Sequence, residues 1–239
     1  MRSIKDFCKS SFMYPVFLKL RTVFKKLYRK YELSVFAKNN RMVLERFNQC
    51  MVDNDIKYSL IYGSLLGAFR DKKWLANDCD IDTLITIEDY GPHIAASLKK
   101  YGFRLLRSYS VDGAKKGLEE TYVLKRIRID IFYLYPSSSP DGLPYCCDFG
   151  NMPGCLSRKE SVKKFGGLRT YKQYFVKPSG IEHIQFEGLS LPIPSNADEI
   201  LKCVYGEDYM VPDPFWDVNN NDKYREICDD IAEYHNYRR

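Results

Sequence analysis

The segment from Ile61 to Asp82 constrains the fold of this chain most, because it combines a Gly-Ser turn with a later D-x-D pair. An apolar run from Tyr58 to Tyr62 leads into Gly63-Ser64, and the next residues, Leu65 to Phe69, can open a helix. A strand followed by such a turn and a helix offers backbone N–H groups and a hydroxyl to a phosphate. The segment therefore predicts an α/β fold with a phosphate-binding turn.

Two carboxylates follow this turn. Asp80 and Asp82 stand at the start of the apolar segment Ile81 to Ile87, which predicts a strand. Residues two apart on a strand point to the same face, so both carboxylates can hold one hard cation, Mg²⁺ or alternatively Mn²⁺. A phosphate-binding turn that faces a carboxylate-held cation indicates an enzyme that transfers a phosphate-containing group.

A third carboxylate lies in the run from Arg126 to Tyr135, whose alternating start predicts a half-buried strand. Asp130 shares one face of that strand with Arg126 and Arg128. One interpretation is a salt bridge from Asp130 to a neighbouring Arg. The upstream D-x-D pair favours another, in which Asp130 binds a second Mg²⁺ or accepts the proton of an attacking hydroxyl.

Four motifs, in order, resemble those of the LicD family, which includes bacterial phosphocholine transferases and the eukaryotic fukutin-related proteins. The family's usual form is close to G-T-L-L-G-A-x-R followed by W-D-D-D-I-D. The matching segments here are Tyr62-Gly-Ser-Leu-Leu-Gly-Ala-Phe-Arg70, Asp78-Cys-Asp-Ile-Asp82, Ile129-Asp-Ile-Phe132 and a C-terminal block from Phe186 to Pro212. The resemblance covers most of the chain, from Arg41 to Pro214.

The resemblance implies a nucleotidyltransferase-like mixed sheet with flanking helices, in a single catalytic domain over residues 39–239. It implies transfer of a phospho-alcohol, such as phosphocholine, from a CDP-alcohol to a hydroxyl of a cell-surface or capsular glycan (for example a teichoic acid), with CMP leaving. By position it implies six site residues: Gly63, Ser64 and Arg70 on the donor phosphates, and Asp80, Asp82 and Asp130 as the catalytic and metal-binding acids.

Two positions depart from the family pattern. Asn77 replaces the Trp before the acidic run, and Cys79 replaces the middle Asp. Neither belongs to the D-x-D pair, so we expect the metal site to persist while local packing or the fit of the donor changes. The alcohol that is transferred, the acceptor glycan, the general base and the oligomeric state stay open at this point.

Charge is concentrated at one end of the chain. The net charge is +6, yet residues 1–30 alone hold nine Lys or Arg and one Asp, so the remainder is slightly acidic. That distribution disfavours a nucleic-acid partner, which would need a broad basic face. With 239 residues and 45% hydrophobic content, the chain can bury one substantial core.

Residues 1–38 are predicted to form a basic amphipathic segment, with a helix after Pro15. Lysines and arginines flank a set of apolar side chains that recur at helical spacing. The apolar residues are Val16, Leu20, Val23, Phe24, Leu27 and Tyr31. Such a helix either binds an anionic membrane surface or packs on the core with a solvated basic face. The run Phe12 to Leu18 is too short for a spanning helix or a signal peptide, so we expect a cytoplasmic protein, peripheral to the inner face of the cell membrane.

The remaining pattern predicts a helix over 39–52, a second over 92–101 and strands over 103–109 and 118–125. Ser195 begins a capping box for a helix that ends near Tyr205, and the stretch from Pro136 to Gly180 is typical of a loop. Two alternatives to the LicD-like transferase remain. One is another nucleotidyltransferase, acting on a small molecule or a protein, and the other is a catalytically inactive membrane-binding relative.

Overall fold

A computed structural model describes residues 14–137, 142–213, 216 and 223–237 of the chain. Its strands are β1 (Ser59–Leu60), β2 (Asp80–Thr86), β3 (Arg104–Val111), β4 (Gly117–Leu124), β5 (Ile127–Leu134), β6 (Tyr145–Gly150), β7 (Leu168–Tyr174), β8 (Ile181–Phe186), β9 (Leu189–Pro194) and β10 (Arg225–Asn236). Its helices are α2 (Tyr14–Asp53), α3 (Tyr62–Leu66), a π-helical turn (Gly67–Asp71), a 3-10 turn (Ile87–Asp89), α4 (Pro92–Lys100), α5 (Arg158–Phe165) and α6 (Ala197–Tyr205).

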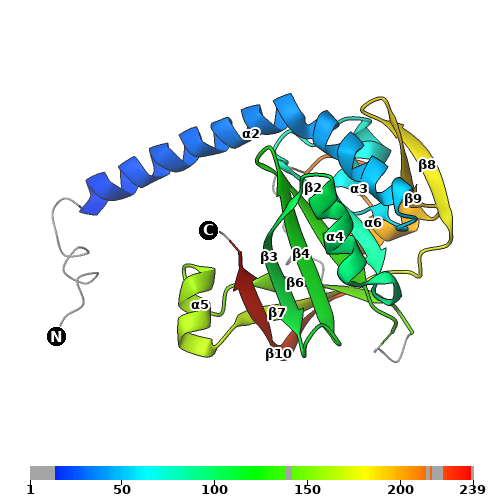
Figure 1. Cartoon of the computed structure of the whole chain (residues 1–239). Coiled ribbons are helices and arrows are strands. Elements are labelled where there is room, and N and C mark those ends of the chain that lie inside the picture. Colours follow the sequence, from blue (N-terminus) through cyan, green and yellow to red (C-terminus); the bar gives the residue numbers. More distant parts are fainter. Residues whose placement is uncertain (1–13, 138–141, 214–215, 217–222, 238–239) are drawn as a thin grey trace.

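Eight strands form one mixed sheet in the order β1-β2-β5-β4-β3-β10-β7-β6, and β8 and β9 form a separate hairpin (Figure 1). β2 and β5 run parallel, whereas the other neighbours are antiparallel. The sheet curls back on itself, because Tyr135 after β5 and Tyr145 in β6 exchange backbone hydrogen bonds of 2.8 and 3.1 Å. This mixed sheet with flanking helices confirms the predicted α/β class.

The second half of α2 is part of the core. It buries one apolar stripe against the domain: Phe36, Val43, Leu44, Phe47 and Met51. The ring of Phe47 meets Tyr58 and Phe103 edge-on, with centroids 5.1 and 6.1 Å apart. Each fully buried side chain of this size contributes about 1.5–3 kcal/mol, so this half of the helix is held firmly to the body.

The first half of α2 extends beyond the sheet (Figure 1). Its apolar side chains are exposed: Leu20, Val23, Phe24, Leu27 and Tyr31. Since each helical residue turns by 100°, this stripe and the buried stripe of the second half point to roughly opposite sides of one continuous helix. The core therefore does not cover the outer stripe. The predicted helix after Pro15 is confirmed, although it continues unbroken past residue 38, and the division into residues 1–38 and 39–239 stays a prediction.

Most short elements lie where the sequence places them. The helix predicted from 92 is α4, the two predicted strands are the antiparallel pair β3 and β4, and α6 ends at Tyr205 before Gly206. The loop predicted from Pro136 to Gly180 is wrong, because this region contains β6, α5 and β7. Local signals for α5 are present: the Ser157 side chain accepts the N–H of Glu160, and Gly166 ends the helix at φ +79°.

No described helix contains an apolar stretch long enough to cross a bilayer.

Candidate active site

The turn between β1 and α3 brings the backbone against two carboxylates. Tyr62 takes a left-handed backbone conformation, φ +47°, which is rare for a bulky side chain. The N–H of Gly63 donates to Asp82 Oδ2 at 3.2 Å. A Cβ at this position would overlap Asp78 Oδ2 and lie 3.3 Å from Asp82 Oδ2. Only glycine leaves room for both carboxylates, which converge on its Cα.

Ser64 is fully buried, and its hydroxyl accepts the backbone N–H of Asp82 at 2.9 Å. The hydroxyl therefore fixes the turn to the start of β2, and it does not line the neighbouring cavity. The donor-phosphate role predicted for Ser64 stays a prediction. Gly63 does line that cavity.

Three acids form a row along the start of β2, which we call the acid row: Asp78, Asp80 and Asp82. Burial, a hydrogen bond with Asp80 and the charge of Asp80 raise the pKa of Asp78 to about 8. Burial opposes ionisation of Asp80, but the hydrogen bond with Asp78 and the Arg128 guanidinium, 3.1 Å away, hold its pKa below the usual value. Burial and the neighbouring charge thus favour the protonated form of Asp78, and Asp80 stays the more acidic of the two.

The pKa of Asp82 is raised well above its usual value, first by burial and then by the charges of Asp80, Asp78 and Asp130. Asp130 on β5 lies directly beside Asp82 in the parallel register. Adjacent strands thus bring the D-x-D pair and the third carboxylate together. The strand predicted to be half-buried, β5, is buried along almost its whole length.

Asp130 also belongs to a polar row that continues across the sheet to Thr121 on β4 and Arg107 on β3. The Thr121 hydroxyl donates to Asp130 Oδ1, and Arg107 lies 3.7 Å from the same oxygen. The salt-bridge interpretation of Asp130 thus has a partner, although that partner is Arg107 and not an arginine of its own strand. Burial raises the pKa of Asp130, with Arg107 acting in the opposite direction.

A cavity of about 790 Å³ opens beside the acid row, and we call it the donor cavity. Of the six predicted site residues, Gly63, Arg70 and Asp82 line it, whereas Ser64, Asp80 and Asp130 do not. The Arg70 guanidinium forms two hydrogen bonds with Asp71, of 2.7 and 3.0 Å, and a third with the carbonyl of Tyr209. Its predicted role at the donor phosphates stays a prediction.

The structure adds residues that the sequence analysis missed. Asp148 and Arg225, from β6 and β10, form a two-pronged ion pair of 2.6 and 2.8 Å at the cavity wall. The buried Nε of Arg225 has no hydrogen-bond partner within the described residues. Aromatic rings complete the lining: Tyr62, Phe132, Tyr205 and Trp216. Tyr62, Phe132 and Tyr205 lie within the motif segments that resemble the family, as does Asp78, whereas Asp148, Arg225 and Trp216 carried no sequence signal.

In the described parts of the chain, no three Asp, Glu, His or Cys side chains converge tightly enough to hold a metal ion as they stand. The donor type nevertheless fits, because carboxylate oxygens are the ligands that Mg²⁺ prefers. The charge fits too, since burial and then repulsion within the acid row raise the pKa values of Asp78 and Asp82, and a bound cation would offset both. Asp80 and Asp82 would hold the ion.

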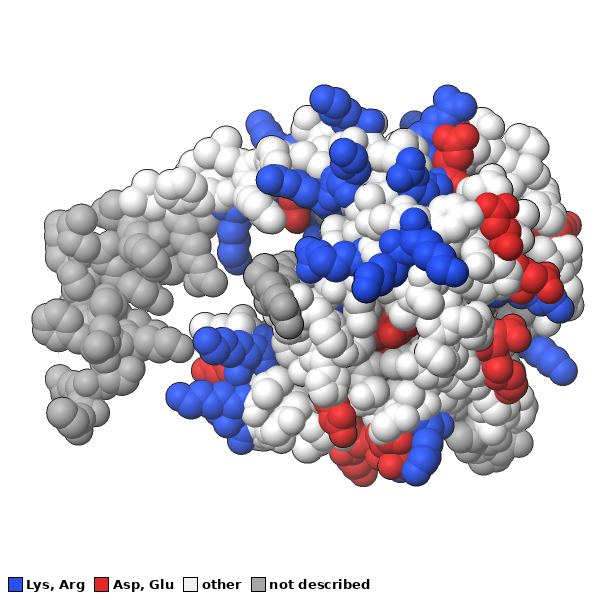
Figure 2. All heavy atoms as spheres, viewed as in Figure 1, with Lys and Arg blue, Asp and Glu red and all other residues white. Residues whose placement is uncertain are grey.

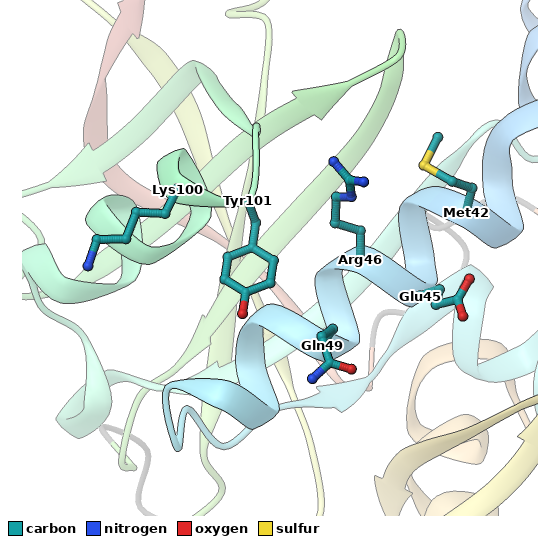
Figure 3. Close-up of a pocket in the computed structure, with 6 residues that line it drawn as sticks. All are labelled: Met42, Glu45, Arg46, Gln49, Lys100 and Tyr101. Atoms are coloured by element: carbon teal, nitrogen blue, oxygen red, sulfur yellow. The ribbon is translucent and has the colours of Figure 1, made fainter.

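A second hollow, of about 470 Å³, lies between α2 and the end of α4 (Figure 3). Its lining includes Glu45, Arg46, Lys100 and Tyr101. Figure 3 shows that Glu45 and Lys100 point away from each other, so the charged groups do not converge on a common point. This hollow offers no arrangement comparable to the acid row.

The family model described as LicD/FKTN/FKRP, nucleotidyltransferase domain, matches residues 55–196, more than half of the chain. The match includes the β1–α3 turn, the acid row and β5, and the chain belongs to this family. It is similar to a mouse protein described as "Ribitol-5-phosphate transferase FKTN", with 21% identity over 184 residues. That alignment covers 77% of this chain and 36% of the mouse protein, so the chain spans about a third of that relative's length.

Proposed function

We propose that the protein transfers a phospho-alcohol, phosphocholine or a similar group, from a CDP-alcohol to a hydroxyl of a cell-surface or capsular glycan. Membership of the LicD/FKTN/FKRP family supports a transferase of this kind. The description of the mouse relative as a ribitol-5-phosphate transferase supports a phospho-alcohol as the transferred group.

One observation carries the proposal: two acids of the row, Asp78 and Asp82, and a set of aromatic and cationic side chains line the same cavity. Tyr205 and Trp216, whose rings pack 4.7 Å apart, offer a surface for a nucleobase. Arg70 and Arg225 offer guanidinium groups, which suit a diphosphate. Carboxylates, guanidinium groups and aromatic rings in one cavity suit a nucleotide diphosphate bound with a divalent cation.

The proposed reaction forms one bond and breaks one. The oxygen of the acceptor hydroxyl attacks the phosphorus that carries the alcohol, the bond from this phosphorus to the bridging oxygen breaks, and CMP leaves with that electron pair. The hydroxyl proton passes to a carboxylate of the site, for which Asp130 is the proposed base. Bound Mg²⁺, held by Asp80 and Asp82, would neutralise charge on the phosphates.

Two alternatives predict different behaviour. Another nucleotidyltransferase would bind CTP or ATP in preference to a CDP-alcohol. An inactive membrane-binding relative would bind neither, yet all of Asp80, Asp82 and Asp130 are present and adjacent. The retained acids favour an active enzyme.

We also propose that the protein acts at the cytoplasmic, inner face of the cell membrane. The outer stripe of α2 is apolar and exposed, with Phe24 at 68% and Leu27 at 57% exposure. Lys25, Lys26 and Lys30 on the same stretch would contact anionic headgroups, each contributing about 1 kcal/mol. The Phe24→Asp/Leu27→Asp variant is expected to lose binding to phosphatidylglycerol vesicles in a flotation assay. Val52→Asp, on the other end of the same helix, is the control, and equal flotation of both variants would refute this location.

The donor is tested by thermal shift with Mg²⁺ and, separately, CDP-choline, CDP-ribitol, CDP-glycerol, CTP and ATP. Stabilisation by one CDP-alcohol, absent in the Asp80→Asn/Asp82→Asn variant, is the expected result. A response to CTP or ATP alone would favour the other nucleotidyltransferase. An equal response in the variant would remove the acid row from donor binding.

A further inference from the structure

A third hollow, of about 400 Å³, lies between the middle of α2 and strands β3, β4 and β5, and we call it the basic groove. The turn between β4 and β5 reaches up to α2 in Figure 1, and Lys and Arg gather on this part of the surface in Figure 2. The acid row separates the basic groove from the donor cavity. Asp78 lines the cavity, and the next residue, Cys79, lines the groove.

Three guanidinium groups line the basic groove, against one carboxylate, Glu32. Arg104 is exposed at its rim, and its guanidinium forms no hydrogen bond or ion pair within the described residues. Arg126 donates to the hydroxyl of Tyr31 and lies 5.7 Å from the centre of that ring. The groove is therefore a concave, net cationic surface.

Arg128 connects the basic groove to the acid row. Its guanidinium lies 3.1 Å from Asp80 and 3.4 Å from Glu32, while its buried Nε has no hydrogen-bond partner among the described residues. A group bound in the groove would thus lie one side chain, that of Arg128, away from Asp80 of the acid row.

The rest of the lining is not polar. Tyr28 and Tyr31, with ring centroids 6.4 Å apart, form one wall. The floor is apolar and consists of Val35, Leu106, Val123 and Ile127. Guanidinium groups bind phosphate through paired hydrogen bonds, and aromatic and apolar walls suit the C–H face of a sugar ring. A neutral sugar would not use the arginines, and inorganic phosphate would not use the tyrosines.

We propose that the basic groove binds a phosphorylated sugar of the acceptor glycan. This inference rests on the proposed function, because a transferase must hold donor and acceptor on either side of the reacting groups. The donor cavity and the basic groove lie on either side of the acid row in that way. A flat lipid surface does not fit, since α2 forms one wall of the groove above Arg128.

The test is calorimetric titration of the full chain with glucose 1-phosphate, N-acetylglucosamine 1-phosphate, mannose 6-phosphate and ribose 5-phosphate. Glucose, inorganic phosphate and glycerol phosphate, a lipid-headgroup fragment, are the comparison ligands. At least one sugar phosphate is expected to bind tenfold more tightly than all three comparison ligands. Equal binding of inorganic phosphate, or no binding of any sugar phosphate, would overturn the inference.

Variants locate the binding. Arg104→Gln/Arg126→Gln is expected to weaken sugar-phosphate binding at least tenfold, and Arg104→Lys/Arg126→Lys, which keeps the charge but not the paired donors, by an intermediate factor. Lys159→Gln/Lys163→Gln removes the same charge from the exposed surface of α5 and is expected to bind like the wild type. Unchanged binding in Arg104→Gln/Arg126→Gln would place the site elsewhere.

The same variants separate this inference from the proposed function. Arg104→Gln/Arg126→Gln should retain the thermal shift with the CDP-alcohol, which also shows that it is folded. If the wild-type protein is stabilised by a CDP-alcohol but binds no sugar phosphate, the acceptor site alone is refuted. If it binds a sugar phosphate in the groove but is stabilised by no CDP-alcohol, the CDP-alcohol reaction is refuted and a sugar-phosphate site is left.

Discussion

The two hollows beside the acid row differ in the balance of charged groups that line them. The donor cavity combines carboxylates whose pKa values are raised by burial and by each other with two arginines that are paired with acids. The basic groove holds three arginines, of which Arg128 alone pairs with carboxylates within the described residues. They are separated by consecutive residues of one extended segment, Asp78 and Cys79. A strand edge can therefore present opposite electrostatics on its two sides, which allows two anionic substrates to be held by different means.

The largest expected effect comes from removing the acids. Asp80→Asn/Asp82→Asn should reduce turnover by about 10³-fold or more, because charge stabilisation is the main contribution of such a site. Its melting temperature should stay close to that of the wild type, since the relief of repulsion at Asp82 is offset by the loss of the Asp80–Arg128 ion pair. Steady-state transfer kinetics and calorimetry check both points, with Asp112→Asn, an acid in the β3–β4 turn, as control. An unfolded variant would contradict the account.

The glycine that fits between the carboxylates gives the next largest effect. Gly63→Ala should destabilise the protein by about 1–3 kcal/mol, because its Cβ would overlap Asp78 Oδ2. Urea denaturation measures the loss. In the Asp78→Ala background the cost should fall, since the obstructing oxygen is gone, and strictly additive effects in this double-mutant cycle would argue against the contact.

Asp78 in the donor cavity should make the stability of the protein depend on pH. The pKa of Asp78 is raised from 3.8 to about 8 in the folded state, so folding favours the protonated carboxyl. Its stabilising contribution is present below about pH 4 and is lost as the pH rises through about 8. The melting temperature of the wild type relative to Asp78→Asn should therefore fall between pH 5 and pH 9 in metal-free buffer. Parallel pH profiles of the two proteins would show that Asp78 ionises normally.

The smallest expected effect comes from adding one negative charge beside the basic groove, at Cys79. The Cys79 thiol accepts hydrogen bonds from Arg29 at 2.7 Å and Arg128 at 3.3 Å. Cys79→Asp, which restores the family residue, should be tolerated because both guanidinium groups can pair with the new carboxylate. Sugar-phosphate binding in the groove should weaken about threefold, by partial neutralisation of Arg128. Cys79→Ser is the neutral control, and equal affinities would show that Arg128 does not contribute.

Part of the site could be predicted because it depends on local periodicity. Asp80 and Asp82 lie on one face of β2, and Asp130 lies in a strand of its own, as alternation along the chain requires. The register that places Asp82 beside Asp130 could not be predicted from the sequence, because strand pairing is set by the whole sheet. The same holds for Ser64, whose hydroxyl is used by the backbone of Asp82.

The acidic strand, the Gly-Ser turn, the family and the helix after Pro15 could be predicted from the residues alone, because each depends on residues that are close together in the chain. The direction in which each half of α2 faces, the pairing of Asp148 with Arg225, and the groove in which arginines from β3 and β5 join tyrosines of α2 are known only from the folded structure. Those partners lie far apart along the chain, and they meet only because the sheet curls and α2 crosses it. Long-range packing, which residue spacing does not encode, fixes such contacts.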